Sequence, residues 1–178
     1  INTKESENRM DQLIKQFCPR LDFDSYEDFV KNYTVNVPED FNFGFDVVDY
    51  WAEHEPDKRA LLYTNDTGVM ETYTFADIKR LSDKTANVFR SLGIGKGDVV
   101  MLILKQRVEA CTCITALCKL GAVCIPATYQ LTPKDIVYRC NAADVKMIVC
   151  VGDDVVIDHV AGSVDKCETL QTVCTVGD

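Results

Sequence analysis

Four kinds of residue in this sequence could take part in chemistry: a loop glutamine, two histidines, three closely spaced glycines and nine cysteines. The glutamine is Gln130, in the segment Thr128-Tyr129-Gln130-Leu131. This segment follows a predicted strand and leads into a predicted helix. A primary amide donates and accepts hydrogen bonds, and open α/β sheets bind ligands beyond the carboxyl ends of their strands. Gln130 is therefore a candidate ligand contact, although a solvated loop residue would show the same spacing.

The glycines at positions 93, 95 and 97 do not form a phosphate-binding loop. A dinucleotide fingerprint needs G-x-G-x-x-G after a strand and at the start of a helix, whereas these glycines follow a predicted helix and precede a predicted strand. Gly97 also stands where a Walker motif has Ser or Thr. We interpret them as a helix end and a tight turn. His54 and His159 form no evident nucleophile–base pair, so we assign no catalytic residue.

The nine cysteines form no C-x-x-C pair, and most lie inside apolar runs. Reduced cysteines that act as small buried hydrophobes explain this pattern best. Neither histidine lies at ligand spacing from a cysteine pair, so we predict no metal ligand. Free thiols also indicate a reducing compartment, most simply the cytoplasm.

Length and charge limit the class of protein further. The 178 residues are enough for one medium domain with a core. The net charge of −9 and the lack of a basic stripe argue against nucleic-acid binding. No apolar run reaches the length of a membrane span, and the polar start is not a signal peptide. The chain begins with Ile1 rather than Met, which leads us to expect a piece of a longer protein.

Residues 1–40 are predicted to form an N-terminal helical arm. Apolar residues at helical spacing predict a first helix over residues 4–17, which Cys18-Pro19 would end. A second helix should begin at Ser25, where Asp28 completes a capping pattern. Its apolar side chains are expected to be buried; they are Tyr26, Phe29, Val30 and Tyr33.

Residues 41–178 are predicted to form part of an α/β subdomain. A helix is expected over residues 46–54, a hairpin over residues 60–73 and a capped helix from Thr74 to Leu92. Apolar strands over 99–104, 122–127, 146–151 and 172–176 then alternate with helices over 108–120, from 133 and over 155–167. The predicted fold class is therefore α/β, with a layered, mostly parallel sheet and helices on both faces. The helical arm and the hairpin are additions to it.

Several motifs resemble those of adenylate-forming acyl-CoA synthetases. Tyr73-Thr74-Phe75 followed by Gly97-Asp98-Val99-Val100 resembles the opening motif of that superfamily. The stretch from Cys118 to Pro126 resembles its second motif, L-K-A-G-x-x-x-x-P. Details around Gln130-Leu131-Thr132, and Phe41-Asn42-Phe43 before Trp51, are most similar to the medium-chain acyl-CoA synthetase branch. The resemblance extends over residues 41–176.

This resemblance implies a ligase that uses ATP, Mg²⁺ and CoA. ATP and a carboxylic acid, such as a medium-chain or short-chain fatty acid, would give an acyl-adenylate, and CoA would then displace AMP. The residue that matches Gln130 lies against CoA in that branch. The family's phosphate loop ending in Pro-Lys-Gly and its catalytic lysine are not found in this sequence. The resemblance thus implies an N-terminal part that is inactive alone, with the ATP and Mg²⁺ sites elsewhere.

Two other functions are compatible with the same residues. One is an adenylation domain that delivers the activated acid to a carrier protein, and the other is a non-catalytic nucleotide-binding module. A homodimer is an option for the assembly.

Overall fold

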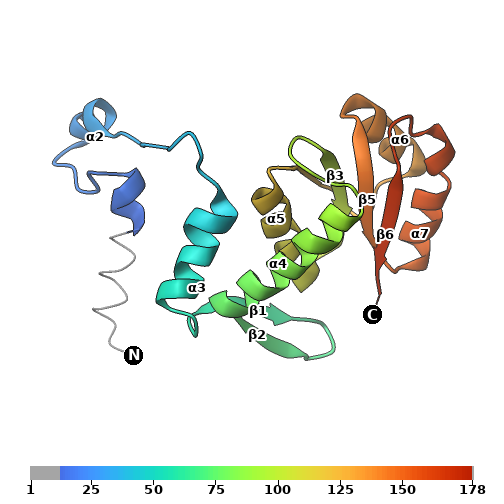
Figure 1. The fold of residues 1–178 in the computed structure, drawn as a ribbon, viewed down its shortest axis with the longest axis horizontal. Coiled ribbons are helices and arrows are strands. Elements are labelled where there is room, and N and C mark those ends of the chain that lie inside the picture. The colour runs from blue at the N-terminus through green and yellow to red at the C-terminus, as the bar shows by residue number, and fades with distance from the viewer. Residues whose placement is uncertain (1–12, 178) are drawn as a thin grey trace. The chain divides into compact units, whose positions relative to one another are not determined.

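The computed structural model describes residues 13–177, which form two compact units (Figure 1). One unit ends at Phe41 and the other begins at Asn42. The interpretation of these parts as an arm and a partial enzyme subdomain stays a prediction. Among residues 13–177, no helix combines the length and the apolar character that crossing a membrane requires.

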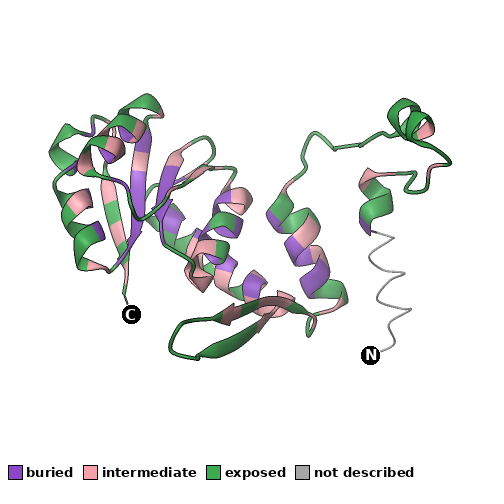
Figure 2. Cartoon of the chain, turned by 180° about the vertical axis from the view of Figure 1, so that it is seen from behind, coloured by how far each residue is buried: buried purple, intermediate pink, exposed green. Residues whose placement is uncertain are grey.

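The first unit contains a short helical turn and one described α-helix. Residues 13–17 are helical, and the remainder of the helix predicted over residues 4–17 lies outside the described residues. Helix α2 spans Tyr26–Asn32, and the Ser25 hydroxyl caps it by accepting the N–H of Asp28 at 3.1 Å. The predicted burial of its apolar side chains is wrong, since none of its residues is buried and Tyr26 is 75 % exposed (Figure 2). Helical periodicity predicts which side chains share a face, but it does not supply a partner that covers them.

The second unit opens with a π-helix, η1, over Phe43–Asp49, followed by α3 over Tyr50–His54. The prediction of one helix over residues 46–54 is therefore wrong in its start and in its first turns. The cause is a contact with a distant segment: the Asn42 amide donates to the Cys118 carbonyl at 2.7 Å and also caps Gly44 at 3.0 Å. A Cβ at Gly44 would lie 2.5 Å from Cγ of Lys119, so only glycine fits here.

The hairpin predicted after this helix is confirmed. Strands β1, Arg59–Thr64, and β2, Met70–Thr74, pair antiparallel. Asn65 organises the turn, because its side-chain oxygen accepts the N–H groups of Thr67 at 3.1 Å and Val69 at 3.0 Å. Gly68 takes a φ of +84°, a conformation that favours glycine.

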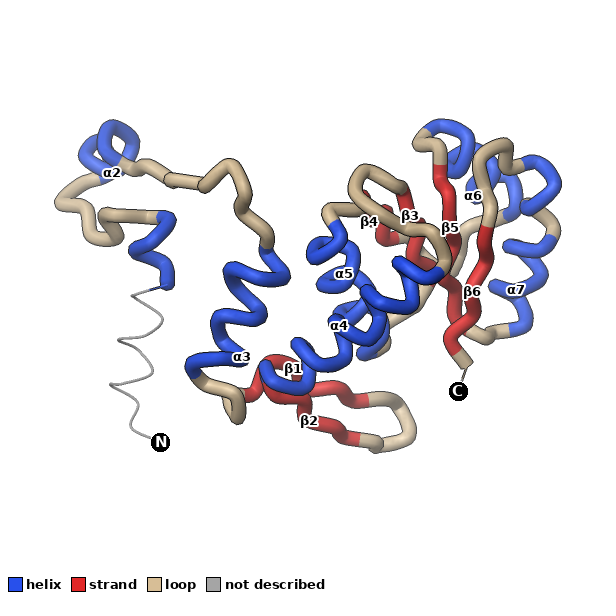
Figure 3. The backbone as a smooth tube through the Cα atoms, viewed as in Figure 1, coloured by secondary structure: helices blue, strands red, loops and turns tan. Residues whose placement is uncertain are grey.

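Four parallel strands form the central sheet, which confirms the predicted fold class. They are β3, Val99–Ile103; β4, Val123–Pro126; β5, Val145–Val151; and β6, Thr172–Val176. Their order across the sheet is β4-β3-β5-β6 (Figure 3). Strands β3 and β5 are buried on both faces, as their continuous apolar runs predict.

Helices cover both faces of this sheet. On one face, Val100 and Leu102 pack in a core with α4, Phe75–Ser91, and α5, Val108–Leu120. On the other face, Met101 and Ile103 pack with α6, Pro133–Ala142, and α7, Asp154–Ala161. The alternation along β3 thus supplies two cores from one strand.

Local sequence signals set most helix ends. Capping boxes at Thr74 and Thr132 start α4 and α6, and Gly121, with φ +65°, ends α5. The helix predicted over residues 155–167 is too long. Helix α7 ends at Ala161, and a separate 3₁₀ turn, η2, covers Val164–Lys166. Ser163 lies between the two elements, and its hydroxyl donates to the His159 carbonyl at 2.6 Å.

Candidate functional site at the carboxyl edge of the sheet

The chain changes direction across the sheet at β3 and β5. These strands are neighbours, yet the chain leaves β3 toward α5 on one face and leaves β5 toward α7 on the other (Figure 3). Loops that diverge in this way open a crevice beyond the strand ends, where open α/β sheets bind ligands. This edge of the sheet is the candidate functional site.

A cavity of about 610 Å³ lies at this edge. Loops from three parts of the second unit enclose it: the segment after β3, the segment after β4 and the turn of the β1–β2 hairpin. The residues that line it are Asp66, Lys105, Gln106, Ala127, Thr128 and Tyr129. The loop that the sequence analysis selected therefore borders a hollow in the surface.

Gln130 is exposed in the loop between β4 and α6. Its neighbours Thr128 and Tyr129 line the cavity, whereas Gln130 does not. Its backbone N–H donates to the Thr128 hydroxyl at 3.3 Å, and its side-chain amide has no hydrogen-bond partner within residues 13–177. The amide is thus available to a ligand.

The end of the same loop is fixed. Leu131 is buried, and its carbonyl oxygen accepts a hydrogen bond from Nδ1 of His159 at 2.9 Å. This bond ties the loop to α7. His159 therefore anchors the backbone of this loop.

Lys105 is a site residue that the sequence reasoning missed. Its Nζ lies 2.7 Å from Oδ2 of Asp153 and 5.0 Å from the centre of the Tyr129 ring. Asp153 begins α7 and also accepts the N–H groups of Val155 and Val156. The hydrogen bond from Lys105, followed by these backbone bonds, lowers the pKa of Asp153. A lysine directly after a buried strand was the signal that could have identified Lys105.

The other chemical candidates are His54 and the cysteines. The His54 ring stacks on Tyr50 at 4.0 Å, and its Nδ1 donates to the Tyr50 carbonyl at 2.8 Å. All nine cysteines are free thiols. In the part of the chain that the structure describes, no three His, Cys, Asp or Glu side chains are grouped so that they could hold a metal ion.

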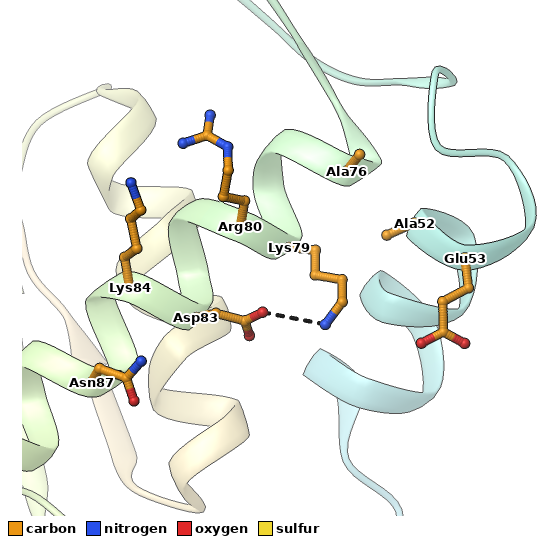
Figure 4. A pocket seen from close by; sticks show the side chains of 8 residues that line it. All are labelled: Ala52, Glu53, Ala76, Lys79, Arg80, Asp83, Lys84 and Asn87. Atoms are coloured by element: carbon orange, nitrogen blue, oxygen red, sulfur yellow. Dashed lines mark hydrogen bonds and ion pairs between the residues drawn. The ribbon is translucent and has the colours of Figure 1, made fainter.

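A second charged site lies away from the sheet edge, between η1, α4 and α5. Lys119, whose side chain is 3 % exposed, donates to Asp49 at 2.7 Å and to Asp83 at 2.6 Å. Lys79 completes the cluster with bonds of 3.0 Å to Asp49 and 3.2 Å to Asp83. A pocket of about 410 Å³ opens beside it, lined in part by Lys79, Asp83 and Lys84 (Figure 4).

This cluster holds helices together rather than binding a ligand. Its two lysines and two aspartates balance in charge, and each contacts both groups of opposite sign. The hydrogen bond to Asp49 is the main cause that raises the pKa of Lys79. Burial opposes ionisation of Asp83, but hydrogen bonds from Lys119 and Lys79 outweigh it and lower its pKa. Both shifts favour the charged forms of Lys79 and Asp83, which suits their pairing.

Comparisons with known proteins agree with the architecture. A family model described as AMP-binding enzyme matches residues 48–178. Acyl-coenzyme A synthetase ACSM5, mitochondrial, of Rattus norvegicus is 36 % identical over 148 residues, which are 80 % of this chain and 25 % of that protein. Acyl-coenzyme A synthetase ACSM3, mitochondrial, of Homo sapiens is 33 % identical over 162 residues, which are 88 % of this chain and 27 % of that protein.

A solved structure gives the same result for the fold. The Mycobacterium tuberculosis fatty acyl CoA synthetase superposes with a TM-score of 0.67 and 27 % identity, covering 76 % of this chain and 26 % of that one. The chain thus spans about a quarter of the length of the proteins it matches.

Proposed function

Because this chain belongs to the AMP-binding enzyme family, we propose that the protein containing it is an AMP-forming acyl-CoA synthetase. The observation that carries this proposal is the match of residues 48–178 to the family, together with identities of 33–36 % to proteins named acyl-coenzyme A synthetases. The described fold agrees with it, since a parallel sheet with a crevice beyond its strand ends suits a nucleotide-derived ligand.

The proposed reaction has two steps. A carboxylate oxygen attacks the α-phosphorus of ATP, the bond to the β-phosphate breaks and pyrophosphate leaves. The thiolate of CoA then attacks the carbonyl carbon of the acyl-adenylate, and AMP leaves. Mg²⁺ would offset charge on the phosphates; we assign it no ligand among the described residues. We propose a medium-chain or short-chain fatty acid as the acid.

We assign Gln130 to the second step, as a contact to CoA. Three features support this assignment: its position beyond the end of β4, the exposure of its side chain and the lack of an internal partner for its amide in the described chain. An amide can bind the amide groups or the phosphates of CoA without a change in protonation. The described residues otherwise act as scaffold and as wall of the crevice.

The test uses the complete protein and separates the two steps. Acid-dependent exchange of pyrophosphate into ATP measures adenylation, and acyl-CoA formation measures transfer. We expect both activities with a medium-chain or short-chain fatty acid. Transfer to a carrier protein instead of CoA would indicate the adenylation-domain function, and nucleotide binding without exchange would indicate a non-catalytic module.

Gln130→Ala tests the assigned contact. Loss of one hydrogen bond to a bound ligand should raise KM for CoA by about tenfold, while pyrophosphate exchange stays unchanged. Lys134→Met on α6 serves as a surface control. An unchanged KM for CoA would remove Gln130 from the site and leave the enzyme class intact.

Location and assembly are also proposals. The nine free thiols support a cytoplasmic location, although two relatives are named as mitochondrial. Imaging of the tagged complete protein decides this, and mitochondrial import would overturn it. Exposed apolar side chains such as Ile157 and Val173 support a homodimer, which sedimentation of the complete protein would reveal as twice the monomer mass.

A further inference from the structure

The segment that follows β3 holds an unusual backbone conformation. Lys105 has a φ of +54°, in the left-handed region that side chains with a Cβ seldom occupy. This conformation is strained for a residue other than glycine. Residues kept in such a state despite the cost are concentrated at binding and catalytic sites, where surrounding contacts enforce them.

The contacts that enforce it come from two different loops. The Lys105 ammonium group pairs with Asp153 at 2.7 Å, at the start of α7, and lies 5.0 Å from the ring centre of Tyr129, in the loop after β4. Lys105 therefore joins all three loops that leave β3, β4 and β5 at the crevice. Both side chains of the ion pair are about one-third exposed, at 35 % and 36 %, so the link lies at the surface of the site.

These contacts complete the fixation of the loop that carries Gln130. At its end, Leu131 is buried and bonded to His159. On the side before Gln130, the Ala127 N–H donates to the Leu102 carbonyl at 2.8 Å, and the Leu131 N–H closes the turn onto the Thr128 carbonyl at 3.4 Å. The contact of Tyr129 with Lys105 is the side-chain restraint on the exposed part of this turn. Without Lys105, Tyr129 would lose its partner on the cavity side, and the exposed turn that carries Gln130 would be held less firmly.

We propose that Lys105 is a positioning residue for CoA binding, which holds the Thr128–Leu131 loop by joining Tyr129 to Asp153. This inference rests on the proposed function. Lys105 acts through Gln130 rather than on the reacting atoms. Its effect should therefore appear in the affinity for CoA and not in adenylation.

Variants separate each contact from general damage to the fold. Lys105→Met removes the charge and keeps the stem, whereas Lys105→Gly removes the side chain and relieves the backbone conformation. Asp153→Asn removes the ion pair and retains a good helix cap. Tyr129→Leu removes the aromatic ring. Lys105→Arg and Tyr129→Phe conserve the charge and the ring.

The experiment measures KM for CoA, kcat and pyrophosphate exchange in the complete protein. We expect Lys105→Met, Lys105→Gly, Asp153→Asn and Tyr129→Leu to raise KM for CoA about three- to tenfold, with exchange unchanged. The two conservative variants should stay within about twofold of the parent. Lys105→Gly should also retain the parent's melting temperature, so lost stability cannot explain its KM.

A double-mutant cycle tests whether Lys105 acts through Gln130. If it does, Lys105→Met should change KM for CoA by less than about twofold in the Gln130→Ala background. Full additivity, an unchanged KM in all four variants, or a parallel loss of exchange and stability would each overturn the inference. Failure of the parent protein to form acyl-CoA would instead overturn the proposed function, and the inference with it.

Discussion

Replacing Lys119 with methionine should destabilise the protein by about 2–3 kcal/mol. Lys119 is the buried member of the charge cluster, and its loss leaves Asp49, with a side chain 8 % exposed, paired only with Lys79. Breaking a buried ion pair by removing one partner costs about 3–5 kcal/mol. The loss expected for Lys119→Met lies at or below the lower end of this range, because Asp49 retains one partner and Asp83, whose side chain is 43 % exposed, can reach water. Methionine keeps the aliphatic stem that lies against Gly44.

Urea denaturation of the 178-residue chain gives the free energy of unfolding. The unfolding is monitored by the fluorescence of the single tryptophan of this chain. Trp51 is 6 % exposed in α3, so its emission reports unfolding of this region. Lys84→Met, at an exposed position of α4 beside the same pocket, is the matched control and should change stability by less than about 0.5 kcal/mol.

A second substitution checks the physical cause. If the cost of Lys119→Met is an uncompensated buried charge, adding Asp49→Asn should recover part of the lost stability, because it removes that charge. A loss below about 1 kcal/mol for Lys119→Met, equal to that of Lys84→Met, would refute the reasoning. So would a double variant that is less stable by the sum of both single changes.

Three further predictions follow from features outside this cluster. Hydrogen bonds from Lys146 and then the Gly95 N–H lower the pKa of Asp98. The stability that the Asp98 carboxylate adds to the fold should thus be present above its ordinary pKa, and it should disappear as pH falls through the lower pKa of the folded state. Asp98→Asn should therefore cost about 1 kcal/mol at pH 7 and nothing near pH 2. Urea titrations across this pH range measure the difference. Gly121→Ala, at φ +65°, should lower stability by about 1–2 kcal/mol in the same assay, and an unchanged midpoint would contradict the conformational argument. Cys111 is exposed, whereas burial raises the pKa of Cys113 to about 12, so a thiol reagent followed by peptide mass mapping should modify Cys111 first.

The parts of the fold that follow local rules could be predicted from the sequence. Strands β3 and β5 appear as continuous apolar runs because both of their faces are covered. Thr74 and Thr132 mark helix starts because a capping box needs only residues three positions apart. These elements and their alternation were enough to give the fold class.

Features that depend on distant contacts could not be predicted in this way. The π-helix after Asn42 depends on a hydrogen bond to Cys118, 76 residues away. The contact of Lys105 with the start of α7 depends on Asp153, 48 residues away. No local periodicity encodes either contact. The position of Gln130 beyond a strand end was predictable from the alternating pattern, whereas its role toward CoA stays a prediction.

The outer side of β6 has a consequence for how this chain behaves in solution. Within residues 13–177, β6 pairs only with β5, so alternate backbone amides and carbonyls of Thr172–Val176 point away from the sheet. This five-residue stretch contains no charge and no proline, the usual features that discourage an added strand. Extended peptides of many sequences could therefore dock there through main-chain bonds alone. Val173→Lys, at a position that is 39 % exposed, should suppress that adhesion without disturbing the crevice beyond β3 and β5.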